Sequence, residues 1–447
     1  MNYALVIAYA LALAAIGILA ARRKGLASYL IADRDIGALQ IGCSVSAGFF
    51  DGFVLVSYTG FVYTYGWPAL SLFIGIAVGF LLFSFFATKL RREAADNGYY
   101  GMSDYFEQRY GHTAAVTVSV FNVIFYEALL LIQFLFGSAI LQDISGWSYP
   151  VCIILIGLML LSYVTLGGFR AVLTTDVFQW ILIAAIVVFF FPYFLRSGAV
   201  RGAFRHADFA GSTETVVGFL IIGCMGVFSA PELWQRSFGA RDDKSIRGGL
   251  IIAGLMLPVI GVILAAIGFA ARGHYPGLAP QSALVRVFRG MLPSSVEALG
   301  LLLLLSAVMS TADTALFIIA PSLSINVLRL SEKRGARRAT AVIIVITVAI
   351  AVVLGLVVRN VLDVAFSLAG MSIGLFPILL GGLIWRLHPK VVVVSLLLGL
   401  ASVLVLIVAG EIRPETSVIS FPVVLLSLLL GSAWVKWRAR RATGEGS

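Results

Sequence analysis

The stretch Ser306-Ala307-Val308-Met309-Ser310-Thr311-Ala312-Asp313-Thr314 lies inside an apolar segment, residues 301–330, that is long enough to cross a membrane. An ionisable side chain in hydrocarbon costs roughly 2.5–3.5 kcal/mol on insertion scales unless it binds a partner. One face of the predicted helix carries Ala307, Ser310, Thr311 and Thr314, with Asp313 at its edge. Such hydroxyl, carbonyl and carboxylate oxygens suit a small hard cation. The alternative is that each hydroxyl donates to the carbonyl four residues earlier and a neighbouring helix keeps Asp313 protonated.

The composition places the whole chain in a membrane. Of 447 residues, 60% are hydrophobic and 12% charged, and the mean hydropathy of +1.01 lies outside the range of soluble proteins. Apolar segments of about 20 residues recur, so we predict an all-α polytopic membrane protein with about 13 transmembrane helices. The predicted spans are residues 2–21, 38–63, 67–89, 114–142, 148–166, 171–195, 214–236, 247–271, 293–328, 338–358, 362–386, 390–410 and 418–436. We interpret the first as a retained span and not a signal peptide, because its basic residues follow it.

The positions of the basic residues explain the net charge of +10, which therefore does not indicate nucleic-acid binding. With the N-terminus outside, most of the 32 Lys and Arg residues fall on cytoplasmic loops, including the loop that starts at Arg236. The basic tail 436–441 then anchors the last span at the cytoplasmic face. We predict a multi-pass protein of the cell membrane, embedded in the lipid bilayer, with its N-terminus outside and its C-terminus in the cytoplasm.

Two predicted spans are interrupted near the middle of the membrane. Glycines flank Asp51 in span 38–63, and a glycine-containing run precedes Pro231 in span 214–236. Glycine lets a helix unwind and expose carbonyls that can bind a cation, although glycines also serve close packing. Interruptions at matching positions indicate a transporter with two inverted repeats and a site at the midplane. The predicted organisation is an N-terminal helix with a basic loop (1–37), two five-helix repeats (38–198 and 199–389), and two C-terminal helices with a basic tail (390–447).

Further polar residues lie inside the predicted spans. Glu127 and Gln133 belong to span 114–142, and we predict that they contact a solute together with Asp51. The alternative for Glu127 is a structural hydrogen bond between helices. Asp176 follows the turn signal Gly167-Gly168, so it either binds an ion or caps the start of a helix.

Three motifs occur in order along the chain: 167–179 (Gly-Gly-Phe-Arg-Ala-Val-Leu-Thr-Thr-Asp-Val-Phe-Gln), 231–236 (Pro-Glu-Leu-Trp-Gln-Arg) followed by 240–244, and 309–314 (Met-Ser-Thr-Ala-Asp-Thr). Together they resemble the signatures of the sodium:solute symporter family. The resemblance implies a leucine-transporter-like core of five plus five helices, with Na+ as the coupling ion. The implied sodium ligands are the carbonyls of Ala47, Phe50 and Ala307 and the hydroxyls of Ser310 and Thr311. A second cation site, found in some members, corresponds here to Asp176, Ser310, Asp313 and Thr314.

The leading hypothesis is a sodium-coupled secondary active symporter that imports a small organic solute by alternating access. The chain has Phe49 where some amino-acid transporters of the family have Asp, so we transfer no solute contacts from them. Mid-membrane carboxylates favour a cationic, amine-bearing or polyol solute. One alternative is a proton-coupled transporter of the same fold, in which the proton carriers are Asp51, Glu127, Asp176 and Asp313.

Other classes remain as alternatives: a non-transporting membrane sensor, and an intramembrane enzyme with Asp51 and Glu127 as an acid pair. The sequence has no nucleophile or metal motif that favours an enzyme, and no P-loop for ATP-driven transport. We therefore predict no enzymatic activity. The predicted partners are a small-molecule solute, sodium and the bilayer, and the oligomeric state is left open.

Overall fold

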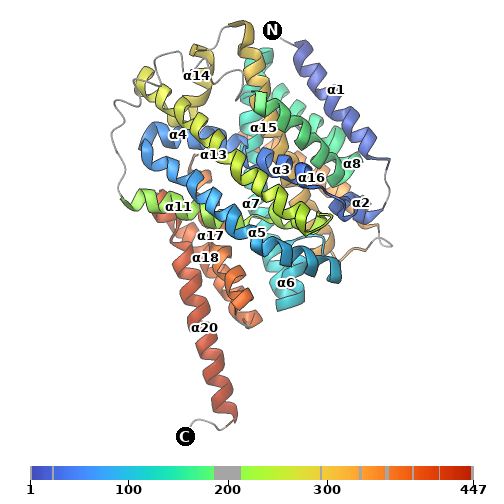
Figure 1. The fold of residues 1–447 in the computed structure, drawn as a ribbon, viewed down its shortest axis with the longest axis vertical. Coiled ribbons are helices and arrows are strands. Elements are labelled where there is room, and N and C mark those ends of the chain that lie inside the picture. The colour runs from blue at the N-terminus through green and yellow to red at the C-terminus, as the bar shows by residue number, and fades with distance from the viewer. Residues whose placement is uncertain are drawn as a thin grey trace.

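The described part of the chain folds into α-helices, as the sequence predicts (Figure 1). The computed structural model describes residues 3–22, 25–185, 213–291, 294–331, 335–357, 362–384, 387–411 and 413–443. Within those ranges there is no strand, only an isolated bridge between Ile36 and Ala240. The α-helices are α1 (Tyr3–Ala20), α2 (Leu26–Ile31), α3 (Ala38–Phe49), α4 (Gly52–Tyr65), α5 (Ser71–Asn97), α6 (Met102–Tyr110), α7 (His112–Ser145), α8 (Tyr149–Ala185), α11 (Thr213–Ser229), α12 (Pro231–Gly239), α13 (Asp243–His274), α14 (Ala283–Met291), α15 (Ser294–Pro321), α16 (Ala336–Val357), α17 (Leu362–Ile384), α18 (Pro389–Ala409), α19 (Pro414–Ser417) and α20 (Ser420–Thr443). Shorter turns of tighter or wider helix are η1 (Ala32–Arg34), η2 (Trp67–Leu70), η4 (Pro280–Ser282) and η5 (Ser322–Val327).

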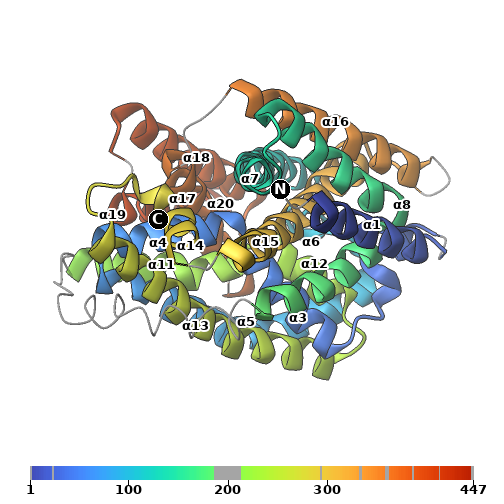
Figure 2. The same ribbon diagram turned by 90° about the horizontal axis from the view of Figure 1, so that it is seen from above.

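Helix α15, which carries the stretch 306–314, lies at the centre of the bundle. The most apolar part of the span Leu299–Val327 is buried entirely by other helices, because α3, α7, α8 and α16 all pack against α15. Figure 2 shows α7 and α15 in the middle, with α1, α8 and α16 on one side and α5 and α13 on the other. The oxygen-bearing side chains of α15 therefore face protein and not lipid.

Two bent helix pairs form at the predicted interruptions. The angle is 53° between α3 and α4 and 42° between α11 and α12. Asp51 is the N-cap of α4, and its carboxylate accepts a hydrogen bond of 2.5 Å from the Val54 backbone N–H. Pro231 is the first residue of α12, where its missing N–H removes no helical hydrogen bond. Both breaks thus follow from helix-start signals in the local sequence.

Helix α8 covers two predicted spans, 148–166 and 171–195, up to the end of the described residues at Ala185. Its interruption lies at Gly168, with φ 67° and ψ −161°. A Cβ on Gly168 would lie 2.7 Å from the Tyr29 carbonyl oxygen, so both the backbone conformation and the space require glycine. The turn signal at Gly167-Gly168 therefore appears as a break within α8.

Close packing accounts for glycines of α5 and α11. A Cβ on Gly75 would lie 2.3 Å from the Leu220 carbonyl oxygen, and a Cβ on Gly223 would lie 2.2 Å from that of Leu72. The two backbones therefore touch, as glycine-rich membrane helices allow. Gly223 has a packing role in addition to lying near the predicted interruption.

By length and composition, eight helices among the described residues could cross a membrane, or up to ten if each bent pair is one span. Each of the thirteen predicted spans falls on a helix or a bent pair, with α8 accounting for two. The count of thirteen stays a prediction, and the repeat boundary at residue 198 lies outside the described residues.

Candidate functional site

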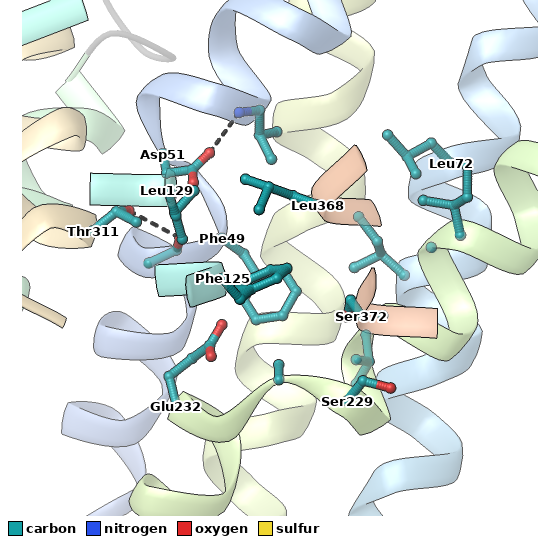
Figure 3. Close-up of a pocket in the computed structure, with 18 of the residues that line it drawn as sticks. Phe49, Asp51, Leu72, Phe125, Leu129, Ser229, Glu232, Thr311, Leu368 and Ser372 are labelled. Carbon is teal, nitrogen blue, oxygen red and sulfur yellow. Dashed lines mark hydrogen bonds between the residues drawn. The ribbon is translucent and has the colours of Figure 1, made fainter. Parts of the chain in front are cut away.

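A cavity of about 180 Å³ lies beside the two helix breaks. Its walls come from α3, α4, α5, α7, α11, α12, α15 and α17, and most of its lining is aromatic or aliphatic. Figure 3 shows Asp51 and Thr311 towards one end and Glu232 towards the other, with Phe125 between them in that view. Among the described residues that line it, none is Lys or Arg. Its polar side chains are Asp51, Tyr126, Ser229, Glu232, Thr311, Thr314 and Ser372.

The α3–α4 break brings together two of the predicted solute contacts. Gln133 of α7 donates from Nε2 to the Asp51 carboxylate at 3.3 Å and accepts from the Gly52 backbone N–H at 3.1 Å. Asp51 is 5% exposed and Gln133 is fully buried. Each Asp51 oxygen accepts one hydrogen bond, Oδ1 from the Val54 N–H and Oδ2 from Gln133, so each keeps a lone pair for a ligand in the cavity.

Thr311, one of the predicted sodium ligands, lies at the same break. Thr311 Oγ1 lies 3.1 Å from the Gly48 carbonyl oxygen, which places α15 directly against the last turn of α3 (Figure 3). The last carbonyls of a helix have no intrahelical partner, so they are free to bind a cation. Ala47, Phe50 and Ala307, the predicted sources of carbonyl ligands, are all buried. Of the hydroxyls in the stretch 306–314, Ser306 bonds back to its own helix, at 3.1 Å from Leu302 O.

Ser310 faces a different neighbour. Its hydroxyl donates to Asp176 Oδ1 at 2.5 Å, and Ser44 of α3 donates to Asp176 Oδ2. Asp176 is fully buried and accepts from side chains of other helices, which differs from the N-cap alternative. Thr314 lies in the same cluster.

Arg236 completes this cluster. The sequence predicts that Arg236 starts a cytoplasmic loop, but in the structure it lies within α12. Its side chain is only 1% exposed and forms an ion pair of 3.2 Å with Asp176. The guanidinium also donates to Ser44 Oγ at 2.8 Å and to Thr314 Oγ1 at 3.0 Å. Helix α12 begins at Pro231 and packs inside the helix bundle, which buries the side chain of Arg236. Hydropathy alone does not predict this burial.

Asp313 lies on another side of α15. Its Oδ2 accepts from Tyr163 at 2.7 Å and from Thr175 at 3.4 Å, and within the described residues its Oδ1 has no hydrogen-bond partner. Asp313 therefore shares its helix with Ser310 and Thr314 but has separate partners.

The two glutamates of the region are placed differently. Glu127 is half-buried, does not belong to the cavity lining, and its Oε1 has no hydrogen-bond partner among the described residues. Glu232 does line the cavity, and Tyr126 donates its hydroxyl to it. In the sequence, Glu232 stands out only as part of the motif 231–236. Its position directly after Pro231, at a predicted mid-membrane break, was the signal for a cavity carboxylate.

The fold is similar to those of solved transporters. A Na+-coupled sialic acid symporter, solved in a substrate-bound outward-open state, has a TM-score of 0.84 with 19% identity, and the match covers 97% of each chain. A nucleobase-cation-symport-1 family transporter has a TM-score of 0.62 with 16% identity over 92% of this chain and 95% of that one. At these identities the similarity concerns the fold.

Relatives in sequence span nearly the same length. The chain is 25% identical to the osmoregulated proline transporter OpuE of Bacillus subtilis, over 90% of this chain and 88% of the relative. It is 23% identical to the sodium/pantothenate symporter of Haemophilus influenzae, over 87% and 86%, respectively. The sequence pattern of the sodium:solute symporter family matches residues 29–399, and the chain therefore belongs to that family.

Proposed function

We propose that this chain imports a small organic solute together with sodium, and that both bind at the α3–α4 break. As a member of its family the chain is a membrane transporter and not an enzyme. The observation that carries the site is the contact of Thr311 with the Gly48 carbonyl, next to the Asp51–Gln133 pair and open to the cavity.

Sodium binds, in this proposal, between the last turn of α3 and the middle of α15. The ligands are the carbonyls of Ala47, Phe50 and Ala307 and the hydroxyls of Ser310 and Thr311. A hydroxyl that donates its hydrogen still offers oxygen lone pairs to a cation, so the hydrogen bonds of Ser310 and Thr311 are compatible with this role. Asp176, Asp313 and Thr314 are the proposed ligands where a second cation binds.

The solute occupies the cavity beside the sodium. The cavity offers two carboxylates, Asp51 and Glu232, among apolar and aromatic walls, which favours an amine-bearing or polyol solute with an apolar body. Relatives carry proline or pantothenate, and we propose a solute of comparable size. Gln133 orients Asp51, and Glu127 stays a proposed contact that would need to reach the solute in another conformation.

Alternating access follows from the two bent pairs. We propose that α3–α4 and α11–α12 begin equivalent five-helix repeats, residues 38–198 and 199–389, flanked by 1–37 and 390–447. Rocking of one part of the core against the other opens the site to each side in turn. Sodium favours the state with the better solute site, and the solute must favour sodium equally.

The protein is a multi-pass membrane protein, and we propose that its N-terminus is outside and its C-terminus in the cytoplasm. The start of α1 and the end of α20 lie at opposite ends of the long axis (Figure 1). Ion pairs join three connections predicted to be cytoplasmic, those between α5 and α7, between α12 and α13, and after η5: Arg91 pairs with Asp243, Arg109 with Glu93 and Arg329 with Glu107. These pairs support a shared side for the three loops.

The test is solute uptake into proteoliposomes. A thermal-shift screen with and without sodium first identifies a solute, and an inward sodium gradient at equal pH should then drive its accumulation. Potassium in place of sodium is the control. Uptake driven by a proton gradient and insensitive to sodium would favour the proton-coupled alternative instead.

A further inference from the structure

The C-terminal part of α20 extends beyond the other helices of the bundle (Figure 1). Helix α20 packs against α17 and α18, and its buried residues Val424 and Leu428 belong to its first half. The apolar segment ends at Val435, and the following residues 436–443 are Lys-Trp-Arg-Ala-Arg-Arg-Ala-Thr. The surface of the helix therefore changes from apolar to strongly basic within about one turn.

Two tryptophan–arginine pairs mark this change. The guanidinium carbon of Arg438 lies 4.6 Å from the ring centroid of Trp434, and that of Arg441 lies 4.1 Å from the ring centroid of Trp437. The spacing within each pair is four residues, and helical periodicity places all four side chains on one face of α20. The tryptophans are 53% and 49% exposed, so the bundle does not cover this Trp–Arg face. Exposed tryptophans beside basic residues are typical of the boundary between membrane and water.

The positive charge of the Trp–Arg face has no acidic counterpart in the protein. Helix α20 contains no Asp or Glu. Within the part of the chain that the structure describes, no ion pair involves Lys436, Arg438 or Arg441. Arg241 differs, because this exposed arginine pairs with Asp35. Guanidinium groups bind phosphate oxygens in a bidentate manner, and basic residues beside a membrane helix attract anionic lipids.

We propose that the Trp–Arg face of α20 binds the headgroup of an anionic phospholipid, with the arginines on the phosphate and the tryptophan rings at the membrane boundary. At the other end of α20, Ser420 Oγ donates to the Gly370 carbonyl of α17 at 2.6 Å. Helix α17 supplies Leu368 and Ser372 to the lining of the central cavity. A lipid bound at the Trp–Arg face therefore stabilises a helix that supports one wall of the cavity.

Native mass spectrometry of the purified protein tests the lipid preference. The delipidated chain in neutral detergent is mixed with equal amounts of phosphatidylcholine and phosphatidylglycerol that have the same acyl chains. The parent should retain mainly phosphatidylglycerol, and Arg438→Gln/Arg441→Gln should lower the ratio of the two bound lipids about tenfold. Arg438→Lys/Arg441→Lys should keep part of the preference, because the charge remains but the bidentate geometry is lost. Arg241→Gln, which removes a paired arginine, is the matched control and should match the parent.

Unfolding temperatures in lipid nanodiscs provide a second measurement that needs neither solute nor sodium. Phosphatidylglycerol in a phosphatidylcholine nanodisc should raise the unfolding temperature of the parent, less so at high salt, and should raise that of Arg438→Gln/Arg441→Gln much less.

Three results would overturn the proposal. The first is equal retention of both lipids by the parent, or a parent-like preference in Arg438→Gln/Arg441→Gln. The second is inorganic phosphate that stabilises the parent in phosphatidylcholine nanodiscs as much as phosphatidylglycerol does, because the ligand would then be a soluble anion. The third is a DNA duplex that binds the parent but not the double glutamine variant, without any lipid preference, because the face would then bind nucleic acid.

Discussion

Gln133 holds the Asp51 carboxylate from across the helix break: its Nε2 lies 3.3 Å from Asp51 Oδ2, while its Oε1 accepts from the neighbouring Gly52 N–H at 3.1 Å. The amide nitrogen and the amide oxygen of buried Gln133 therefore both form hydrogen bonds at the point where α3 ends and α4 begins. The orientation of the Asp51 side chain depends on Gln133 of α7 as well as on α4. A movement of α7 would therefore also move the Asp51 carboxylate at the break.

Replacing Gln133 should affect both stability and solute binding. Gln133→Leu leaves the Gly52 N–H and one edge of Asp51 without these partners, at a cost of about 1–3 kcal/mol for an unsatisfied buried group. We expect a lower unfolding temperature and a solute half-saturation concentration about tenfold higher. Gln142→Leu, on the exposed surface of the same helix, is the control. Parent-like stability and affinity in Gln133→Leu would mean that the bridge has no role.

The hydroxyls of α15 should differ in their effect on sodium activation. Ser310→Ala and Thr311→Ala each remove a proposed ligand and should raise the sodium concentration for half-maximal uptake about tenfold, which corresponds to about 1.4 kcal/mol. Thr311→Ser should retain most of the activation. Ser306→Ala is the matched control, because that hydroxyl bonds back to Leu302 O in its own helix and is not a proposed ligand. Unchanged sodium dependence in both test variants would remove Ser310 and Thr311 from the site.

Neutral variants of the three carboxylates should affect solute affinity to different degrees, depending on whether each carboxylate lines the cavity. Glu232→Gln removes charge from a lining residue and should weaken apparent affinity for a cationic solute at least tenfold, with sodium affinity nearly unchanged. Glu127→Gln should have a smaller effect, because Glu127 is not part of the lining. Asp51→Asn should disturb solute and sodium together, since Asp51 adjoins the break. Solute titrations at saturating sodium measure the apparent solute affinity of each variant and so rank the three effects. If all three variants match the parent, the carboxylates are structural.

Cysteine labelling tests the orientation in the membrane. The parent cysteines Cys43, Cys152 and Cys224 are first replaced. Ala279→Cys, on the connection before η4, should react with an impermeant reagent from outside, and Ala95→Cys, at the end of α5, should react only after permeabilisation. Both positions are exposed. The reverse pattern would contradict the orientation set by the basic loops.

Asp242 should make stability depend on pH. Hydrogen bonds from Ser245, including one of 2.7 Å from its backbone N–H, lower the pKa of Asp242 at the N-cap of α13. A lowered pKa means that the carboxylate stabilises the fold above its ordinary value of about 3.9, and that this contribution is lost as pH falls through the folded value. Asp242→Ala should lower the unfolding temperature at pH 7, and its difference from the parent should shrink towards pH 3. Asp242→Asn, a good N-cap without charge, should lose less at pH 7. A difference between Asp242→Ala and the parent that does not change with pH would contradict a role for the charge.

Local sequence patterns are enough to predict the class of the protein, its helices and the two breaks. Hydropathy places apolar segments in the membrane because water-free surroundings demand helices there. Asp51 and Pro231 start new helices through capping and ring geometry, which act within a few residues. The polar face of α15 is also predictable from local sequence, because helical periodicity alone brings Ser310, Thr311 and Thr314 to neighbouring positions.

Which of these groups contact one another depends on the tertiary structure. Asp176 and Ser44 are 132 residues apart, and Thr311 and Gly48 are 263 apart. Glu127 and Glu232 look alike in sequence, yet only Glu232 reaches the cavity. The local sequence determines in which direction a side chain points from its helix axis. Which neighbour that side chain contacts depends on how helices distant in sequence pack together. Arg236 shows the difference most clearly: its position reads as a loop start, and the path of α12 buries it against Asp176.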